Sequence, residues 1–196
     1  MVAVLSKNGG MQGVVDYLSR FARTAKSGQL VTWFLGVIIF FDDYSNTLLV
    51  GNTMRPVTDK LRISREKLAY LVDSTAAPVA AIAFITTWIG AELGYIKDGI
   101  ASIDGLDENA YHVFLNSLAY SFYPILTLLF MLMLILQGRD FGPMHASEVK
   151  ARQLPAFKPT GYNRMEGEAA AFYMEQGLKP TAGLAILPVL AVIGVV

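Results

Sequence analysis

The chain has 196 residues, a formal net charge of zero and no cysteine; 54% of its residues are hydrophobic and 16% are charged. Soluble domains have about 25% charged residues, so this composition, with a mean hydropathy of +0.44, predicts an integral membrane protein. It excludes a disulfide framework and a thiolate metal site, His112 and His145 alone are too few for a zinc site, and no basic patch interleaved with aromatics indicates nucleic acid.

Both ends of the sequence are expected to be parts of longer helices. Gly9 and Gly10 are typical of a helix C-terminus, so residues 1–29 are interpreted as the end of a truncated helix followed by an amphipathic surface helix, Met11 to Gln29. Residues 182–196 are apolar but shorter than the ~20 residues of a membrane span, which predicts a truncated transmembrane helix. A fragment of a longer transporter is therefore expected, and a complete small membrane protein is the alternative.

Residues 30–54 place adjacent carboxylates, Asp42 and Asp43, inside an apolar segment. An ionisable group in hydrocarbon is costly, so its presence indicates function. The segments on both sides are basic, and the positive-inside rule puts them both in the cytoplasm. This favours a re-entrant hairpin or broken helix with its tip near Asp42 to Thr47; a single polar-kinked span is the alternative.

Residues 55–76 are expected to form a cytoplasmic loop with a short surface helix, Ser64 to Val72. A second polar cluster, Asp73 to Thr75, follows just before Pro78, which lacks the backbone N–H that a helix interior needs. We therefore expect a helix boundary there, with these polar groups where the chain enters the bilayer. An ordinary helix N-cap is the simpler interpretation of the same residues.

The remaining segments follow the charge pattern. The expected elements are a transmembrane helix at 77–96, an acidic external loop at 97–110, a second transmembrane helix at 111–137, and a cytoplasmic loop at 138–181 that contains a surface helix, Met165 to Leu178. In the second span, polar residues from Asn116 to Thr127 recur on one helical stripe, which is expected to face the bundle interior. The predicted fold is an all-α polytopic membrane protein with a re-entrant helical hairpin.

Two motifs resemble the NhaC family of Na⁺/H⁺ antiporters, within the wider ion transporter superfamily. They are Phe40-Phe-Asp-Asp-Tyr-Ser-Asn-Thr-Leu-Leu-Val-Gly-Asn-Thr-Met-Arg-Pro-Val-Thr-Asp59 and Ile63-Ser-Arg-Glu-Lys-Leu-Ala-Tyr-Leu-Val-Asp-Ser-Thr-Ala-Ala-Pro78. The Ser45-Asn46-Thr47 triplet is also similar to the hairpin-tip signature of divalent-anion/sodium symporters. The resemblance implies a multi-pass transporter of the bacterial inner membrane that exchanges Na⁺ for H⁺, with about one repeat of an inverted-repeat fold in this chain and the remainder as its partner.

The two polar clusters supply the oxygen ligands that a hard cation such as Na⁺ prefers. The candidate ion-binding residues are Asp42, Asp43, Ser45, Asn46, Thr47, Asp73, Ser74 and Thr75. Na⁺ itself is expected at Asp42, Asp43, Asn46 and Asp73, and a proton is expected to compete for one of the carboxylates. Accessory candidates are Asn116, Tyr120, Glu92 and Arg55.

Other functions remain open at this point. An organic-acid exchanger of the malate or lactate type would need a cationic clamp, for which Arg55 is the candidate, and a non-transporting truncated fragment is a further alternative. An intramembrane aspartyl protease also uses two buried aspartates, but the sequence lacks a Gly-x-Gly-Asp pattern, so no enzyme activity and no cofactor are expected. The expected partners are Na⁺, protons, the bilayer and, through the Asn116 to Thr127 stripe, further copies of the chain.

Overall fold

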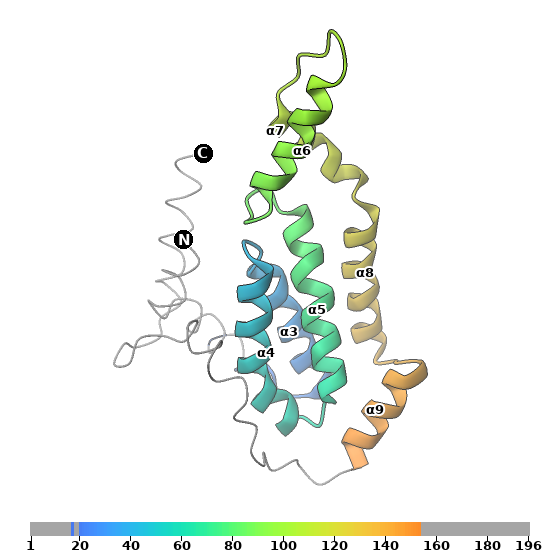
Figure 1. Ribbon diagram of the computed structural model, residues 1–196. Coiled ribbons are helices and arrows are strands. Elements are labelled where there is room, and N and C mark those ends of the chain that lie inside the picture. Colours follow the sequence, from blue (N-terminus) through green and yellow to red (C-terminus); the bar gives the residue numbers. More distant parts are fainter. Residues whose placement is uncertain (1–16, 18–19, 154–196) are drawn as a thin grey trace, which may run out of the picture.

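The computed structural model describes Tyr17 and residues 20–153, and all the regular structure in them is helical, as predicted (Figure 1). The elements are α3 (Ala25–Ile38), α4 (Asp43–Lys60), α5 (Arg65–Ile82), α6 (Ile89–Ala101), α7 (Ala110–Ser117), a 3₁₀ turn (Leu118–Tyr120), α8 (Phe122–Gln137) and α9 (Gly142–Gln153). The predicted helix end at Gly9 and Gly10, the Met165 to Leu178 helix and the truncated span at 182–196 lie outside the described residues.

Helices α3 and α4 form a hairpin with a non-helical break between Ile38 and Asp43. Their outer ends lie together, since a Cβ on Gly28 near the start of α3 would lie 2.5 Å from Leu61 Cδ1 at the end of α4. The break falls slightly earlier than expected, because Asp43 to Thr47 are already helical. Insertion of this hairpin into a bilayer stays a prediction.

Local capping explains where the hairpin's helices begin. Thr24 and Ser27 form a capping box at the start of α3, and the Asp42 carboxylate accepts a hydrogen bond from the Ser45 N–H at the start of α4. The expected surface helix from Met11 to Gln29 is therefore not continuous: residues 20–24 are non-helical, and its last residues open α3.

Helix α5 differs most from the expected boundaries. It begins after Ser64 and continues through Pro78 to Ile82, although a helix end was predicted before that proline. The expected continuous span at 77–96 is instead the end of α5, a non-helical linker at 83–88 and the start of α6. Burial of Ala76, Val79 and Ala80 on α5 supplies packing energy that offsets the missing hydrogen bond at Pro78.

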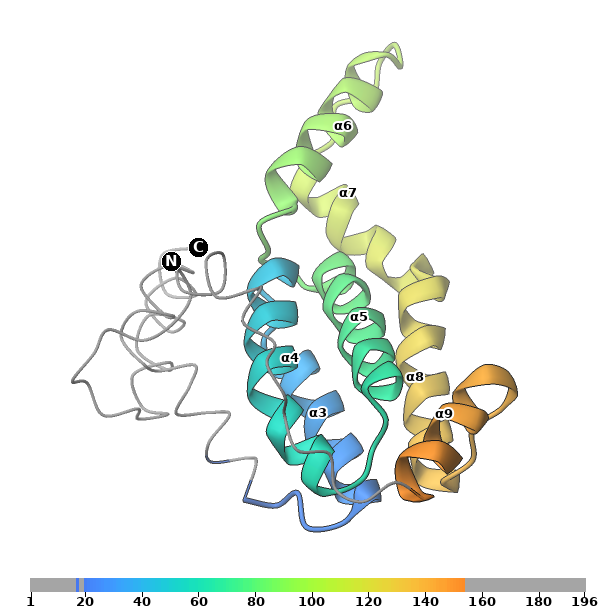
Figure 2. The same ribbon diagram turned by 60° about the horizontal axis from the view of Figure 1, so that its bottom comes forward.

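The core lies where α3, α4 and α5 meet, and α8 packs beside α5 (Figure 2). The main apolar cluster contains Val31, Leu35, Ile39, Phe41, Val50, Met54, Leu68 and Val72. A second cluster, of Leu71, Met131 and Ile135, joins α5 to α8. Each such buried side chain contributes about 1.5–3 kcal/mol. Helices α6 and α7 pack on each other and project beyond this core, so the three-helix junction carries the rigid part of the fold.

Among the described residues, no single helix is both long and apolar enough to cross a membrane. The segment from Ala110 to Gln137 passes that test only as a bent pair, because α7 with its 3₁₀ turn meets α8 at 43°. The helix expected at 111–137 is therefore interrupted and bent before Phe122, and its passage through a membrane stays a prediction. Asn116, Ser117 and Tyr120 are exposed while Pro124 is buried, so the polar stripe does not face the interior as one unit.

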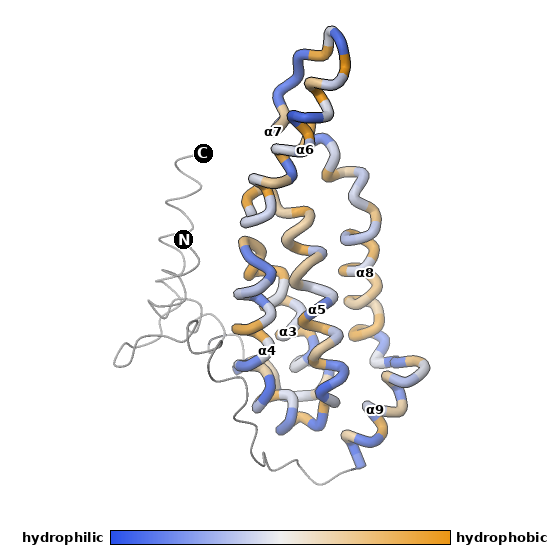
Figure 3. Tube along the Cα trace, in the orientation of Figure 1, coloured by the Kyte–Doolittle hydropathy of each residue, from blue (hydrophilic) through white to orange (hydrophobic). Residues whose placement is uncertain are grey.

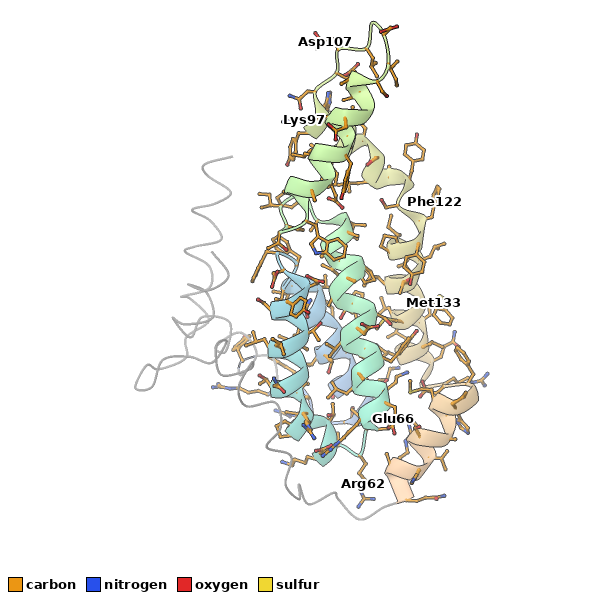
Figure 4. All side chains as sticks on the ribbon, viewed as in Figure 1. Arg62, Glu66, Lys97, Asp107, Phe122 and Met133 are labelled. Carbon is orange, nitrogen blue, oxygen red and sulfur yellow. The ribbon has the colours of Figure 1, made fainter. Side chains whose placement is uncertain are left out.

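Along the long axis of the molecule, the surface has an apolar middle part on α8 and charged residues at both ends (Figure 3 and Figure 4). Helix α8 is apolar over most of its length (Figure 3), and its outer face carries exposed Phe122, Leu126, Leu129, Phe130 and Met133. Charged residues gather at the two ends, with Arg62 and Glu66 at one and Lys97 and Asp107 at the other (Figure 4). We call the first of these the basic end; it comprises the start of α3, the α4–α5 turn and the α8–α9 turn.

Candidate functional site

Asn46 on α4 holds the hairpin closed at its tip. Its side chain is fully buried, and Nδ2 donates to the Gly36 carbonyl at 2.7 Å and to the Ile39 carbonyl at 2.9 Å. These carbonyls lie in the last turn and the C-cap of α3, where backbone C=O groups have no N–H donor within the helix. The amide of Asn46 therefore supplies the C-terminal cap of α3 from the neighbouring helix.

This capping role leaves the other amide atom of Asn46 unused. Because both neighbours are carbonyl oxygens, the nitrogen must face them, which fixes the orientation of the amide and turns Oδ1 the other way. Oδ1 is buried and accepts no hydrogen bond in the structure. An unpaired buried acceptor costs about 1–3 kcal/mol, so Asn46 is satisfied on one side only.

Ser45, the preceding residue, is also buried with an unpartnered side-chain oxygen. Three buried threonines show the ordinary alternative, because Thr32, Thr58 and Thr75 each donate to the carbonyl four residues earlier in their own helix. A hydroxyl inside a helix normally satisfies itself in this way. The two oxygens Ser45 Oγ and Asn46 Oδ1 therefore mark the tip as a place where the described residues leave buried polar atoms without a hydrogen-bond partner.

The second predicted cluster reaches this place through Thr75. A Cβ on Gly36 would lie 2.2 Å from Thr75 Oγ1 and 2.6 Å from Thr75 Cβ, so α3 and α5 are in direct contact at the residue whose carbonyl binds Asn46. Thr75 is thus the residue of the second cluster that contacts α3, and convergence of the two clusters on one ion stays a prediction. We call Gly36, Ile39, Ser45, Asn46 and Thr75 the tip junction.

The two carboxylates lie at the edge of the tip junction and face the α5–α6 linker. Asp42 Oδ1 accepts from Thr87 Oγ1 at 3.1 Å, and Asp43 Oδ1 accepts from Trp88 Nε1 at 3.3 Å. The Thr87 N–H donates to the Phe41 carbonyl at 3.0 Å, and the rings of Phe40 and Phe84 stack with centroids 6.1 Å apart. The break between α3 and α4 therefore contacts the linker between α5 and α6.

The other predicted site residues are not brought to this place. Thr47 and Asp73 are exposed, and Ser74 hydrogen-bonds Tyr70 on its own helix. Asp73 and Thr75 are two residues apart on one helix and so point about 200° apart, which is why only Thr75 meets Gly36. Na⁺ binding at Asp42, Asp43, Asn46 and Asp73 stays a prediction, and no group of three His, Cys, Asp or Glu in the described part of the chain is placed to hold a metal.

The accessory candidates are scattered. Asn116 and Tyr120 are exposed in and after α7, whereas Glu92 lies in the first turn of α6 with a buried, unpartnered Oε2. Arg55 lies on α4, about 18 Å along the helix axis from Asp43. The four candidates are therefore spread over α4, α6, α7 and the 3₁₀ turn that follows α7.

Sequence reasoning missed Gly36, Thr87 and Trp88. The signal for the linker was present, because Thr86-Thr87 interrupts an apolar run and is followed by Gly90, a combination typical of a helix break. For Gly36 there was no local signal, since a close contact with a residue 39 positions later depends on the tertiary fold.

Comparisons with known proteins give one informative match. A protein of Haemophilus influenzae, described only as uncharacterized, is 28% identical over 145 residues, which cover 74% of this chain and 28% of that protein. The chain therefore corresponds to less than a third of this relative's length. No protein-family profile matches the sequence. No solved structure matches it either.

Proposed function

We propose that the chain is part of a secondary active transporter of the inner membrane that exchanges Na⁺ for H⁺ at the tip junction. The observation that carries this proposal is the pair of buried, unpartnered oxygens, Ser45 Oγ and Asn46 Oδ1. Buried polar groups are normally hydrogen-bonded, so two adjacent exceptions at a helix break call for a ligand. Oxygen atoms at broken-helix ends are the groups that bind the coupling ion in transporters built from discontinuous helices.

Charge favours a cation over an anion at this place. Asn46 Oδ1 can only accept, and the C-terminal end of α3 carries the negative end of the helix dipole. The N-terminal end of α4, which would attract an anion, is already occupied by the carboxylates of Asp42 and Asp43. An organic-acid exchanger is not favoured, because Arg55 is too far along α4 to clamp a carboxylate at the tip.

The carboxylates of Asp42 and Asp43 are the groups that bind the exchanged proton in this proposal. Asp42 caps α4 through the Ser45 N–H at 2.7 Å, so a carboxylate and an unpartnered hydroxyl share one helical turn. A cation held beside this carboxylate favours its charged form, and a proton on the carboxylate disfavours the cation. Na⁺ and H⁺ then compete, which is the coupling that exchange requires. The apolar outer face of α8 supports the membrane part of the proposal, since so large an exposed apolar surface fits hydrocarbon.

The test is Na⁺ binding to the purified chain in competition with protons. Na⁺ should raise the unfolding temperature relative to choline at equal ionic strength, and the apparent Na⁺ affinity should weaken as the pH is lowered, because protons compete for the carboxylate. Asp42→Asn or Asp43→Asn should abolish the pH dependence. An equal effect of choline, or a pH dependence that survives in both variants, would refute the proposal.

A further inference from the structure

A pocket at the basic end is separate from the tip junction. It has a volume of about 530 Å³ and lies between the non-helical segment before α3 and the last turns of α4. Arg20 and Arg23 line one side, and Lys60 lines the other. Arg20, Arg23 and Lys60 belong to the basic flanks of residues 30–54, and the proposed exchange does not use them.

The cations of this pocket are not neutralised by the described part of the chain. Arg20, Arg23 and Lys60 are exposed and form no ion pair among the described residues. Asp59, the residue beside Lys60, pairs instead with Arg65 at 3.3 Å. None of the described residues that line the pocket is acidic, so three positive charges face one concave space. Such a concentration of like charge at a concave surface attracts an anion.

The rest of the lining is apolar. Ala22 on one side and Val57 and Leu61 on the other give the pocket a hydrocarbon wall next to its cations. A free inorganic anion would contact only the cations. A phospholipid can place its phosphate against the cations and its glycerol and acyl chains against the apolar wall. Basic pockets between helices on the cytoplasmic side of membrane proteins bind lipid headgroups for this reason.

We propose that this pocket binds the phosphate-bearing headgroup of an anionic phospholipid. The arginines match phosphate oxygens through their planar guanidinium groups, and Lys60 adds a point charge on the opposite wall. The lipid would join the segment before α3 to the end of α4 and so hold the outer ends of the hairpin together. The assignment of the phosphate to a lipid rests on the membrane location in the proposed function. It does not depend on Na⁺ or H⁺ binding at the tip junction.

The experiment measures the unfolding temperature of the purified full chain in detergent as short-chain phosphatidylglycerol is added, with phosphatidylcholine and inorganic phosphate as separate arms. Phosphatidylglycerol should stabilise the chain, and the other two should do so weakly. In the triple variant Arg20→Gln, Arg23→Gln, Lys60→Gln, the apparent affinity for phosphatidylglycerol should fall by about tenfold or more.

A matched triple variant, Lys97→Gln, Arg139→Gln, Lys150→Gln, removes the same charge from exposed residues outside the pocket and should retain the affinity. Equal losses in the two triple variants would overturn the proposal, because net charge alone would then explain the binding. Equal stabilisation by inorganic phosphate would overturn the lipid assignment. Since Na⁺ is absent from these assays, lipid binding stands or falls independently of the proposed exchange.

Discussion

The tip junction and the basic end both bury polar groups, but only the basic end completes their interactions. At the basic end, buried Lys67 pairs with Asp140, and the Glu148 carboxylate accepts from the Ser64 N–H at 2.7 Å. At the tip junction, Ser45 Oγ and Asn46 Oδ1 have no partner. Among the described residues, the fold therefore satisfies buried Lys67 and Glu148 at the basic end and leaves two buried oxygens unpartnered at the proposed ion site.

The clamp at the basic end joins segments far apart in the sequence. Lys26 Nζ donates to the Leu136 carbonyl at 2.6 Å, which ties the start of α3 to the end of α8. Arg62 Nη1 donates to the Arg152 carbonyl at 3.5 Å, and Arg152 pairs with Glu148. These contacts fix the outer ends of α3, α4 and α5. Motion is then expected at the tip, where the α5–α6 linker is held by a few exposed hydrogen bonds.

The largest expected effect comes from breaking the clamp. Lys67→Met leaves the Asp140 carboxylate buried and unpaired, which should lower the free energy of unfolding by about 3–5 kcal/mol. Chemical denaturation measures this change in the free energy of unfolding. Adding Asp140→Leu removes the orphaned charge and should restore most of the loss; a double variant as unstable as the single one would contradict an ion-pair explanation.

A smaller loss is expected at the tip. Asn46→Leu removes both hydrogen bonds to the α3 carbonyls and should lower the free energy of unfolding by about 2–4 kcal/mol. Asn52→Leu, on the same helix and half-buried, is the matched control and should change it by less than about 1 kcal/mol. Similar losses in both would show that Asn46 does not cap α3.

The crossing of α3 and α5 gives a third test, with opposite signs at two glycines. Gly36→Ala should destabilise by about 1–3 kcal/mol, because its Cβ meets Thr75. Gly51→Ala, which meets nothing within 4 Å, should stabilise α4 by about 0.8–1 kcal/mol. Melting temperatures of the two variants distinguish close packing from helix propensity. Stabilisation by both substitutions would contradict a close contact between Gly36 and Thr75.

Sequence patterns predicted the helical class and a break near Asp42, because both are local, but they did not predict α9, which lies in the expected loop at 138–181. The carboxylates in an apolar segment and the Asp42 N-cap are visible within a few residues. The continuation of α5 through Pro78 was not predictable, since it depends on packing from both sides. The Lys67–Asp140 pair joins residues 73 positions apart, and no local signal distinguishes Lys67 from the exposed lysines around it. Long-range contacts therefore decided which residue of the second cluster reaches α3: Thr75 contacts Gly36, whereas Asp73 is exposed.

The most direct test of the central claim compares two hydroxyls on α4. Ser45 Oγ is unpartnered, whereas Thr58 Oγ1 donates to the Met54 carbonyl at 3.0 Å. At ten times its dissociation constant, Na⁺ should raise the free energy of unfolding by about 1.4 kcal/mol in the unmodified chain and in Thr58→Val. In Ser45→Ala this gain should largely disappear, while stability without Na⁺ stays the same or rises. An undiminished Na⁺ effect in Ser45→Ala would contradict the assignment of the tip junction as the ion site.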